Sequence, residues 1–203
     1  MDLINIKNKN EAILKAKGIK VNPNLPTIEA LPEVNPRSAS DVAKRACALS
    51  YVVGLAFGAE PEFLIKNLKD YVLWDFVTEK EKSLLKAPEI LPEEENELSW
   101  IVEAIQALAW CLGVIDMDNF EGCSDELSSK FPMNEDPKKF IIGSSLRSIS
   151  EIQDQCDFHY QLHWAAIHGQ AMKISEALIC ERRRALDWVY GVERDWDDIP
   201  LYT

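Results

Sequence analysis

The chain of 203 residues has no apolar run long enough to cross a membrane. Its longest uncharged stretch, Ala46–Ala59, is shorter than the ~18 residues that a membrane-spanning helix needs. The first residues also lack the apolar core of a secretion signal. The cysteines have no C-x-x-C spacing, and their odd number is typical of reduced thiols: Cys47, Cys111, Cys123, Cys156 and Cys180. We therefore expect a soluble cytoplasmic protein without disulfides.

Glycine is scarce, with eight residues, and no glycine-rich pattern for binding phosphates or dinucleotides occurs. Gly143-Ser144-Ser145 does not complete the G-x-S-x-G turn of serine hydrolases. The acidic segment Asp116–Gly122 has the look of a calcium loop, but Phe120 occupies a ligand position and the glycine comes one residue late. We expect no cofactor, and no familiar catalytic motif indicates an enzyme.

Basic residues are outnumbered, because 34 Asp and Glu stand against 22 Lys and Arg and leave a net charge of -12. Such a charge repels phosphate backbones and anionic lipid headgroups. We expect binding neither to nucleic acid nor to membrane surfaces. A basic protein is the partner that this charge favours.

Apolar residues recur at helical spacing along most of the chain. We expect a mainly all-α fold, a single domain over residues 1–203 with about seven to nine helices and at most minor β-structure near the N-terminus. Residues 1–37 should form a short helix, about Glu11–Lys17, and a proline-marked arm that packs on a helical body of residues 38–203. One long helix, Glu93–Leu112, should lie near the centre of that body because it is apolar on most sides.

The phrase Ala-Leu-x-aromatic-x-x-Gly occurs three times, ending at Gly54, Gly113 and Gly191. Each copy is typical of the last apolar turns of a helix that meets a glycine. The copies are unevenly spaced, which favours similar helix ends over a repeated structural unit.

Glu181 lies in the middle of an apolar helical stripe, where a lone carboxylate would be costly. Arg182 and Arg184 flank the stripe and could pair with it, and Glu103 lies between two tryptophans on the central helix. These residues suggest either a buried ion-pair network that fixes helix packing or a pair of carboxylates tuned for acid–base catalysis beside an arginine.

Cys156, His159 and His163 share one face of a helix and are residue types that zinc prefers. Cys156 and His163 stand ~10 Å apart along the helix axis, however, and no second cluster supplies further ligands. We expect histidines that flank the core, and no bound metal.

Asp195-Trp196-Asp197-Asp198 gathers three carboxylates around an aromatic side chain close to the C-terminus. Three acids suit a cation or an arginine-rich partner. The alternative is a tail that Trp196 pins onto the domain and that is otherwise solvated.

Several short motifs, in order along nearly the whole chain, carry a resemblance to a known family. They are Gly18-Ile19-Lys20-Val21, Leu25-Pro26, Arg37-Ser38, Arg45, Trp100-x-x-Glu103-Ala104, Trp110-x-x-Gly113, Glu181 to Trp188, Trp196-Asp197-Asp198 and Thr203. With these motifs the chain resembles the mainly bacterial domain-of-unknown-function family 4272 (DUF4272). The resemblance implies no activity. It marks positions that match the family pattern: Glu103, Arg182, Arg183, Trp188, Trp196 and Asp197.

Two functions from different classes follow. The first is an acidic binding or regulatory protein that engages a basic protein partner through Asp195–Asp198, as a toxin-neutralising immunity protein would. The alternative is a hydrolase that uses Glu103 and Glu181 with Arg182 or Arg184. A water-accessible pocket where these side chains converge would favour the enzyme.

Overall fold

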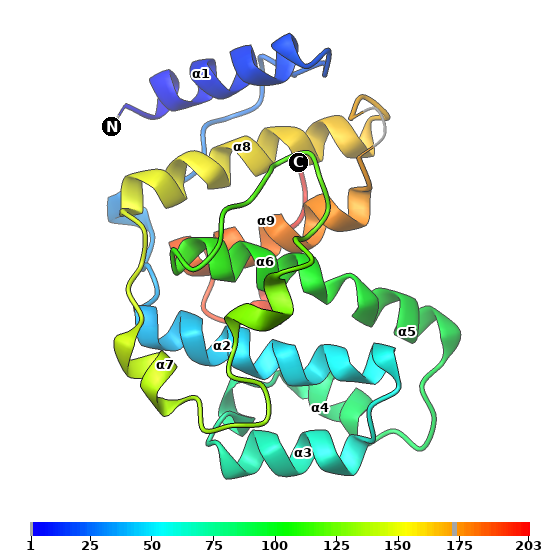
Figure 1. Cartoon of the computed structure of the whole chain (residues 1–203). Helices are drawn as coiled ribbons and strands as arrows, with labels where there is room; N and C mark the ends of the chain where they lie inside the picture. Colours follow the sequence, from blue (N-terminus) through cyan, green and yellow to red (C-terminus); the bar gives the residue numbers. More distant parts are fainter. Residues whose placement is uncertain (1, 172–173) are drawn as a thin grey trace. The chain divides into compact units, whose positions relative to one another are not determined.

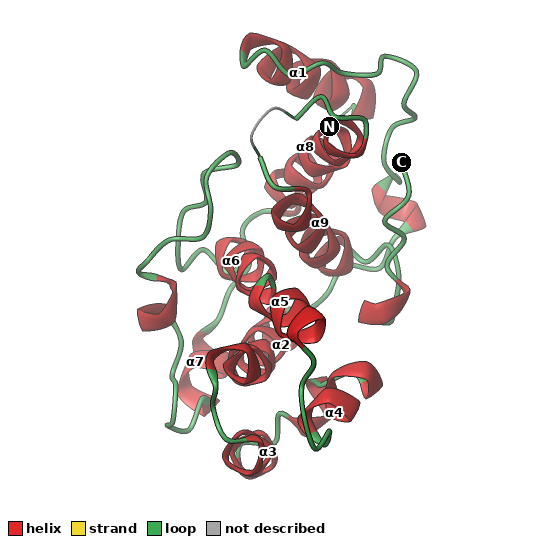
Figure 2. Cartoon of the chain, turned by 90° about the vertical axis from the view of Figure 1, so that its right-hand side faces the viewer, coloured by secondary structure: helices red, strands yellow, loops and turns green. Residues whose placement is uncertain are grey.

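The computed structural model describes residues 2–171 and 174–203. In that part of the chain every regular element is a helix, and there is no strand (Figure 2). The expected all-α fold is confirmed, and the absence of strands among these residues agrees with the expectation of at most minor β-structure near the N-terminus. No helix in the described ranges is long and apolar enough to traverse a bilayer.

The chain divides into two compact units, each made of segments that are distant in sequence. Unit 1 comprises Met1–Arg37, Asp118–Gly122 and Arg147–Thr203, and unit 2 comprises Ser38–Met117 and Cys123–Leu146. The division after residue 37 coincides with the end of the predicted arm, but the C-terminal helices that we expected in the body belong to unit 1. A single domain over the whole chain stays a prediction.

Unit 1 is built on three helices that lie side by side (Figure 1). They are α1 (Leu3–Ala16), α8 (Ile149–Ile167) and α9 (Glu176–Tyr190), with two 3-10 turns, η1 (Leu31–Glu33) and η5 (Trp196–Asp198). Helix α8 packs against both α1 and α9. Its apolar side chains Ile152 and Leu162 are fully buried. The long helix α8 is therefore the middle layer of this unit.

Helix α1 corrects our prediction of a short helix over Glu11–Lys17. The helix begins at Leu3, because the Asp2 carboxylate accepts the N–H of Ile4 at 3.1 Å and caps it. Its sequence is polar, and only Ile6 and Leu14 are buried apolar residues. Because buried apolar residues are so sparse, the sequence pattern did not reveal the first two turns of the helix. The predicted end is right, since Gly18 follows with a φ of +78°.

Unit 2 contains the remaining helices of the described chain. They are α2 (Ala39–Val52), α3 (Pro61–Asp70), α4 (Glu79–Leu85), α5 (Pro92–Ser99), α6 (Ile101–Cys111) and α7 (Lys138–Gly143), with the 3-10 turns η2 (Val53–Phe57), η3 (Trp74–Phe76) and η4 (Leu127–Lys130). Helix α2 packs against α3, α6 and α7 and is buried along most of its length. Helix α6 is buried from Glu103 to Cys111. These two helices form the core of unit 2.

A buried ion pair ties α2 to α4. The Arg45 guanidinium donates to both Glu81 carboxylate oxygens, at 2.8 and 2.7 Å, and to the Phe76 carbonyl at 2.7 Å. Glu81 also accepts the N–H of Thr78 at 2.9 Å and so completes a capping box at the start of α4. These hydrogen bonds are all made within unit 2, so the ion pair has a structural role.

The long central helix that we predicted over Glu93–Leu112 is interrupted at Trp100. There the N–H of Trp100 bonds to the Glu97 carbonyl and the N–H of Glu103 to the Trp100 carbonyl, both three residues back rather than four. The two halves have different neighbours, since α5 packs on η2 and α6 on α2. The chain therefore changes direction between a polar helix and a buried one.

The three phrases ending in glycine do not end alike. Gly113 and Gly191 follow α6 and α9 with φ of +69° and +89°. Gly54 instead lies inside η2, and the left-handed cap comes four residues later at Gly58. Our prediction holds for two copies, whereas in the first the helical chain continues past its glycine as a 3-10 turn to the cap at Gly58.

Candidate functional site

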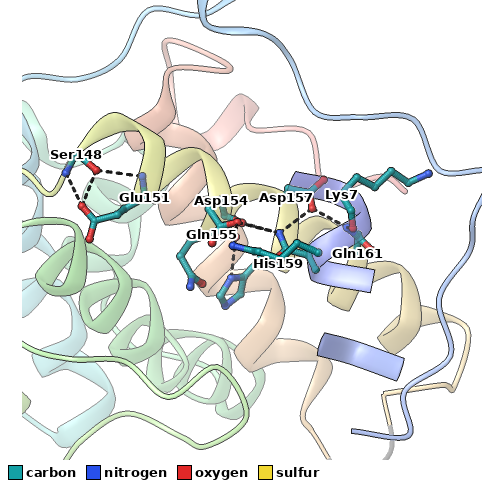
Figure 3. A network of polar contacts seen from close by, with 10 residues as sticks. Lys7, Ser148, Glu151, Asp154, Gln155, Asp157, His159 and Gln161 are labelled. Atoms are coloured by element: carbon teal, nitrogen blue, oxygen red, sulfur yellow. Dashed lines mark hydrogen bonds and ion pairs between the residues drawn. The ribbon is translucent and has the colours of Figure 1, made fainter. Parts of the chain in front are cut away.

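A buried network of polar side chains joins α1 and α8 in unit 1 (Figure 3). Asn10 of α1 donates to the Asp157 carboxylate at 2.9 Å, and Gln161 donates to the same oxygen at 2.6 Å. Burial raises the pKa of the Asp157 carboxyl, although both hydrogen bonds oppose the shift. The network pairs the Asp157 carboxylate with a donor from each of the two helices, so it specifies how α1 docks on α8.

Arg183 of α9 is the centre of a second buried polar cluster. Its Nε donates to Asp187 Oδ2 at 3.2 Å, and its Nη1 to His163 Nδ1 at 2.6 Å. Its Nη2 donates to the carbonyls of Pro200 and Tyr202, at 3.2 and 3.1 Å. One side chain thus holds α8, α9 and the C-terminal segment together.

The arginine also fixes the protonation of His163. Burial, followed by the nearby Arg183 charge, lowers the pKa of His163 to about 4, so the ring is neutral at pH 7. A guanidinium can only donate, and His163 Nδ1 must therefore be the unprotonated nitrogen. The proton is on Nε2, which lies 3.1 Å from Cys180 Sγ and donates to it.

The predicted metal candidates do not share a ligand position. His159 bonds through Nδ1 to the Gln155 carbonyl at 3.0 Å (Figure 3), and the Cys156 thiol hydrogen-bonds the Asp187 carboxyl. Burial, followed by the Arg182 charge, lowers the pKa of His159 to about 3. Each candidate thus has a separate partner, and the absence of zinc at these residues stays a prediction.

A different trio has metal-binding residue types close together. Possible ligand atoms of His163, Glu176 and Cys180 all lie within 4.8 Å of one another. A metal on His163 Nε2 would have to displace its proton, and Nδ1 could not take that proton up because it faces the Arg183 donor. The geometry therefore argues against metal chemistry at this trio.

A small pocket opens beside the Arg183 cluster. Its volume is about 140 Å³, and it lies between the arm, α8, α9 and the C-terminal segment; its lining residues include Ile28, Glu29, Tyr160, Arg183, Asp187 and Tyr202. Burial raises the pKa of Asp187 to about 7, although Arg183 pulls it down. The predicted catalytic residues Glu103, Glu181, Arg182 and Arg184 do not line this pocket.

Glu103 and Arg182 both bind the backbone of the loop that follows α6. In unit 2, buried Glu103 accepts the N–H of Cys123 at 2.9 Å. In unit 1, fully buried Arg182 donates to the carbonyls of Asp118 and Glu121, at 2.6 and 2.7 Å. Both residues have contacts suited to holding a loop.

Glu181 and Arg184, the other two candidates, form an ion pair within α9. The side chains are 14% and 30% exposed, so the pair lies at the edge of the core rather than inside it. Glu181 belongs to unit 1 and Glu103 to unit 2. Of the predicted combinations, the structure brings together Glu181 with Arg184.

The C-terminal acidic segment is exposed around a buried anchor. Trp196 is 7% exposed and packs edge-on against Trp188, with ring centroids 5.5 Å apart. Asp195, Asp197 and Asp198 are all exposed. The Trp196 ring is therefore unavailable to a partner, and the three carboxylates are available.

Arg37 fixes the chain just before this segment. It donates to the Glu193 carbonyl at 2.7 Å and to the Arg194 carbonyl, and its guanidinium stacks 4.8 Å from the centroid of the Trp188 ring. Arg37 thus holds the chain just before the acidic segment, and Trp196 anchors the segment from within. We call Asp195, Asp197 and Asp198 the acidic turn.

Sequence reasoning missed the Arg183 cluster. The spacing of Arg183 and Asp187, four residues apart on a helix, is a signal for an ion pair and was available in the sequence. The contacts of Arg183 with His163 and with two C-terminal carbonyls come from distant segments, and no local pattern indicates them.

Comparison with known proteins gives one match. A family described as Domain of unknown function (DUF4272) matches residues 6–199. No curated protein and no solved structure matches the chain.

Proposed function

The chain belongs to the DUF4272 family, and we propose that it is an acidic binding protein whose acidic turn engages a basic protein partner, in the manner of an immunity protein. The observation that carries the proposal is the acidic turn itself. Three exposed carboxylates project from a segment that Arg37 and Trp196 hold in place. A segment already ordered before binding loses less conformational entropy in a complex.

The net charge of -12 supports the same proposal. Charge of one sign speeds encounter with a basic partner and disfavours nucleic acid and anionic membranes. The five cysteines are free thiols in the structure, which fits the reducing cytoplasm that we propose as its location.

The hydrolase alternative has less support. Glu103 accepts a backbone N–H and Arg182 donates to two carbonyls, so both are engaged in holding a loop. None of the four predicted catalytic residues lines the pocket beside Arg183. That pocket could take a small molecule, but its Arg183–Asp187 ion pair is committed to contacts within the protein.

The test is capture of protein partners from native cell extract at low and near-physiological salt. Asp195→Asn/Asp197→Asn/Asp198→Asn should abolish capture of the partner. The matched control is Glu93→Gln/Glu95→Gln/Glu97→Gln, which removes the same charge from exposed positions of α5 and should retain the partner. Association should also slow as salt rises, because screened charges steer encounter less.

Two results would refute the binder. One is equal loss of capture in both triple variants, which would mean that capture depends on the net charge of the protein and not on a defined surface. The other is a hydrolase activity that disappears in Glu103→Gln or Glu181→Gln while no partner is recovered at either salt.

A further inference from the structure

Lysines surround Trp74 in unit 2. The ammonium nitrogens of Lys69, Lys82 and Lys86 lie 5.2, 5.6 and 5.5 Å from the centroid of its ring. On the same 3-10 turn, Phe76 has Lys44 at 5.1 Å from its ring centroid. We call Lys69, Trp74, Lys82 and Lys86 the lysine–tryptophan cluster.

The cluster forms where three short elements meet. Lys69 lies in the last turn of α3, Trp74 begins η3, and Lys82 and Lys86 lie in α4 and just after it. Helix α3 packs against both η3 and α4 (Figure 1). Lys69 and Lys86 are exposed, while Trp74 and Lys82 are half-buried. The cluster is therefore open to solvent and rests on a packed framework.

The positive charge of the cluster is only partly balanced from within. Lys82 pairs with Glu79 at 2.8 Å, and the Lys86 charge also acts on the Glu79 carboxylate, but in the described chain neither Lys69 nor Lys86 forms an ion pair. The face of an indole ring attracts an ammonium group, yet three ammonium groups beside one ring repel one another. Unit 2 has 18 Asp and Glu against ten Lys and Arg, so this gathering of cations runs against its overall charge.

Helix ends explain part of this arrangement. A lysine near a helix C-terminus complements the helix dipole, and Lys69 and Lys86 are both so placed. That explanation covers each lysine separately but not the convergence of three on one ring.

The polar groups of the cluster are all donors. Three ammonium groups and the indole N–H, which has no hydrogen-bond partner in the described chain, offer no acceptor. Several donors and several positive charges suit an anion with more than one negative charge and several oxygens. A phosphate group has both properties, whereas a single carboxylate has two oxygens and one charge.

We propose that the lysine–tryptophan cluster is a binding site for the phosphate group of a small phosphorylated molecule. The bound phosphate accepts hydrogen bonds from Lys69, Lys86 and the Trp74 indole, and it relieves the repulsion among the lysines. The Glu79 carboxylate pairs with Lys82 in the unbound protein, so it competes with the phosphate for this lysine. The site is separate from the acidic turn, which belongs to the other unit.

Isothermal titration of the purified protein with inorganic pyrophosphate tests the proposal. Lys69→Gln/Lys86→Gln should weaken binding by at least about tenfold, since two nearby charges are lost. Glu79→Gln should tighten binding, because it removes the competing carboxylate; its side chain is 88% exposed, so the fold should tolerate the change. A matched control, Lys138→Gln/Lys139→Gln, removes the same charge from exposed positions of α7 and should bind as the wild type does.

Circular dichroism of each variant shows that it is folded. Co-sedimentation with vesicles that contain phosphatidic acid distinguishes a lipid phosphate from a soluble one: binding to vesicles alone would overturn the small-molecule ligand. Absence of pyrophosphate binding by the wild type, or equal loss in the two double lysine variants, would overturn the site. Unchanged affinity in Glu79→Gln would also contradict it.

Discussion

His159 and His163 are two neutral histidines on α8, and both owe their neutrality first to burial. Their pKa values are about 3 and about 4, against an ordinary 6.5. In the unfolded chain each takes up a proton below pH 6.5, whereas in the folded chain it does not until the pH is much lower. Both histidines therefore stabilise the fold above pH 6.5 and lose that contribution as the pH falls through their folded pKa values.

The free energy of unfolding should thus fall as the pH drops from 6.5 towards 4. Asp187 acts in the opposite sense, because burial raises its pKa from 3.8 to about 7, so its contribution is lost as the pH rises through 7. Asp157, whose pKa burial also raises, acts in the same sense as Asp187, so the fall measured between pH 6.5 and 4 is the histidine contribution less that of the two aspartates. Urea titrations at several pH values measure the net slope.

His159→Asn separates the effect of one histidine. Its amide can keep the bond to the Gln155 carbonyl but takes up no proton, so the slope should decrease by up to about 1.4 kcal/mol per pH unit. His168→Asn, at an exposed histidine after the same helix, controls for loss of a histidine as such. A slope unchanged in His159→Asn would mean that this ring is protonated in the folded protein.

At the scale of the element, the glycines that end helices differ in what surrounds them. A Cβ on Gly191 would lie 2.1 Å from the Asn35 carbonyl oxygen, whereas one on Gly113 would have no atom within 4 Å. Both residues have positive φ, so both substitutions strain the backbone. The chain that follows α9 is thus in direct contact with the arm.

Gly191→Ala should therefore destabilise the protein by more than Gly113→Ala. Strain at positive φ accounts for about 1 kcal/mol at either position, and at Gly191 the backbone of Asn35 must also move. Thermal unfolding of the two variants side by side measures the difference. Equal losses would show that the arm shifts freely.

Elements with a strong local signal were predictable from sequence. Ser38 caps α2, and Thr78 with Glu81 opens α4, because capping depends on residues within one turn. The start of α1 was missed because its apolar stripe is sparse, although Asp2 caps it locally. The break at Trp100 was missed because it depends on what each half of the helix packs against. In the candidate site, too, contacts between residues close in sequence were predictable and contacts between distant segments were not. The Glu181–Arg184 pair follows from spacing, whereas the partners of Arg183 and the loop contacts of Glu103 and Arg182 join segments far apart in the chain.

At the scale of the whole molecule, the two units are interleaved along the chain. The backbone passes from one unit to the other after residues 37, 117, 122 and 146. The short segment Asp118–Gly122 belongs to unit 1, while the residues on either side of it belong to unit 2. Unfolding of either unit would release an anchored end of a segment in the other.

We therefore predict one cooperative unfolding transition, as the single-domain interpretation requires. Differential scanning calorimetry should give equal calorimetric and van't Hoff enthalpies. Arg182→Met should lower the midpoint without splitting the transition, and Arg184→Met, its partly exposed neighbour, should lower it less. Two resolved transitions, or a stable proteolytic fragment covering residues 38–146, would contradict this prediction.

The packing of α1 against α8 also sets an order of events during synthesis. Residues 3–16 leave the ribosome well before residues 149–167, which form the helix α8 that packs against them. At ordinary translation speeds that interval is on the order of ten seconds. For that time α1 lacks its contact with α8, although residues 38–146 are already being completed. Helix α1 therefore lacks its partner α8 until residues 149–167 have been synthesised, and its polar composition keeps it soluble during that interval.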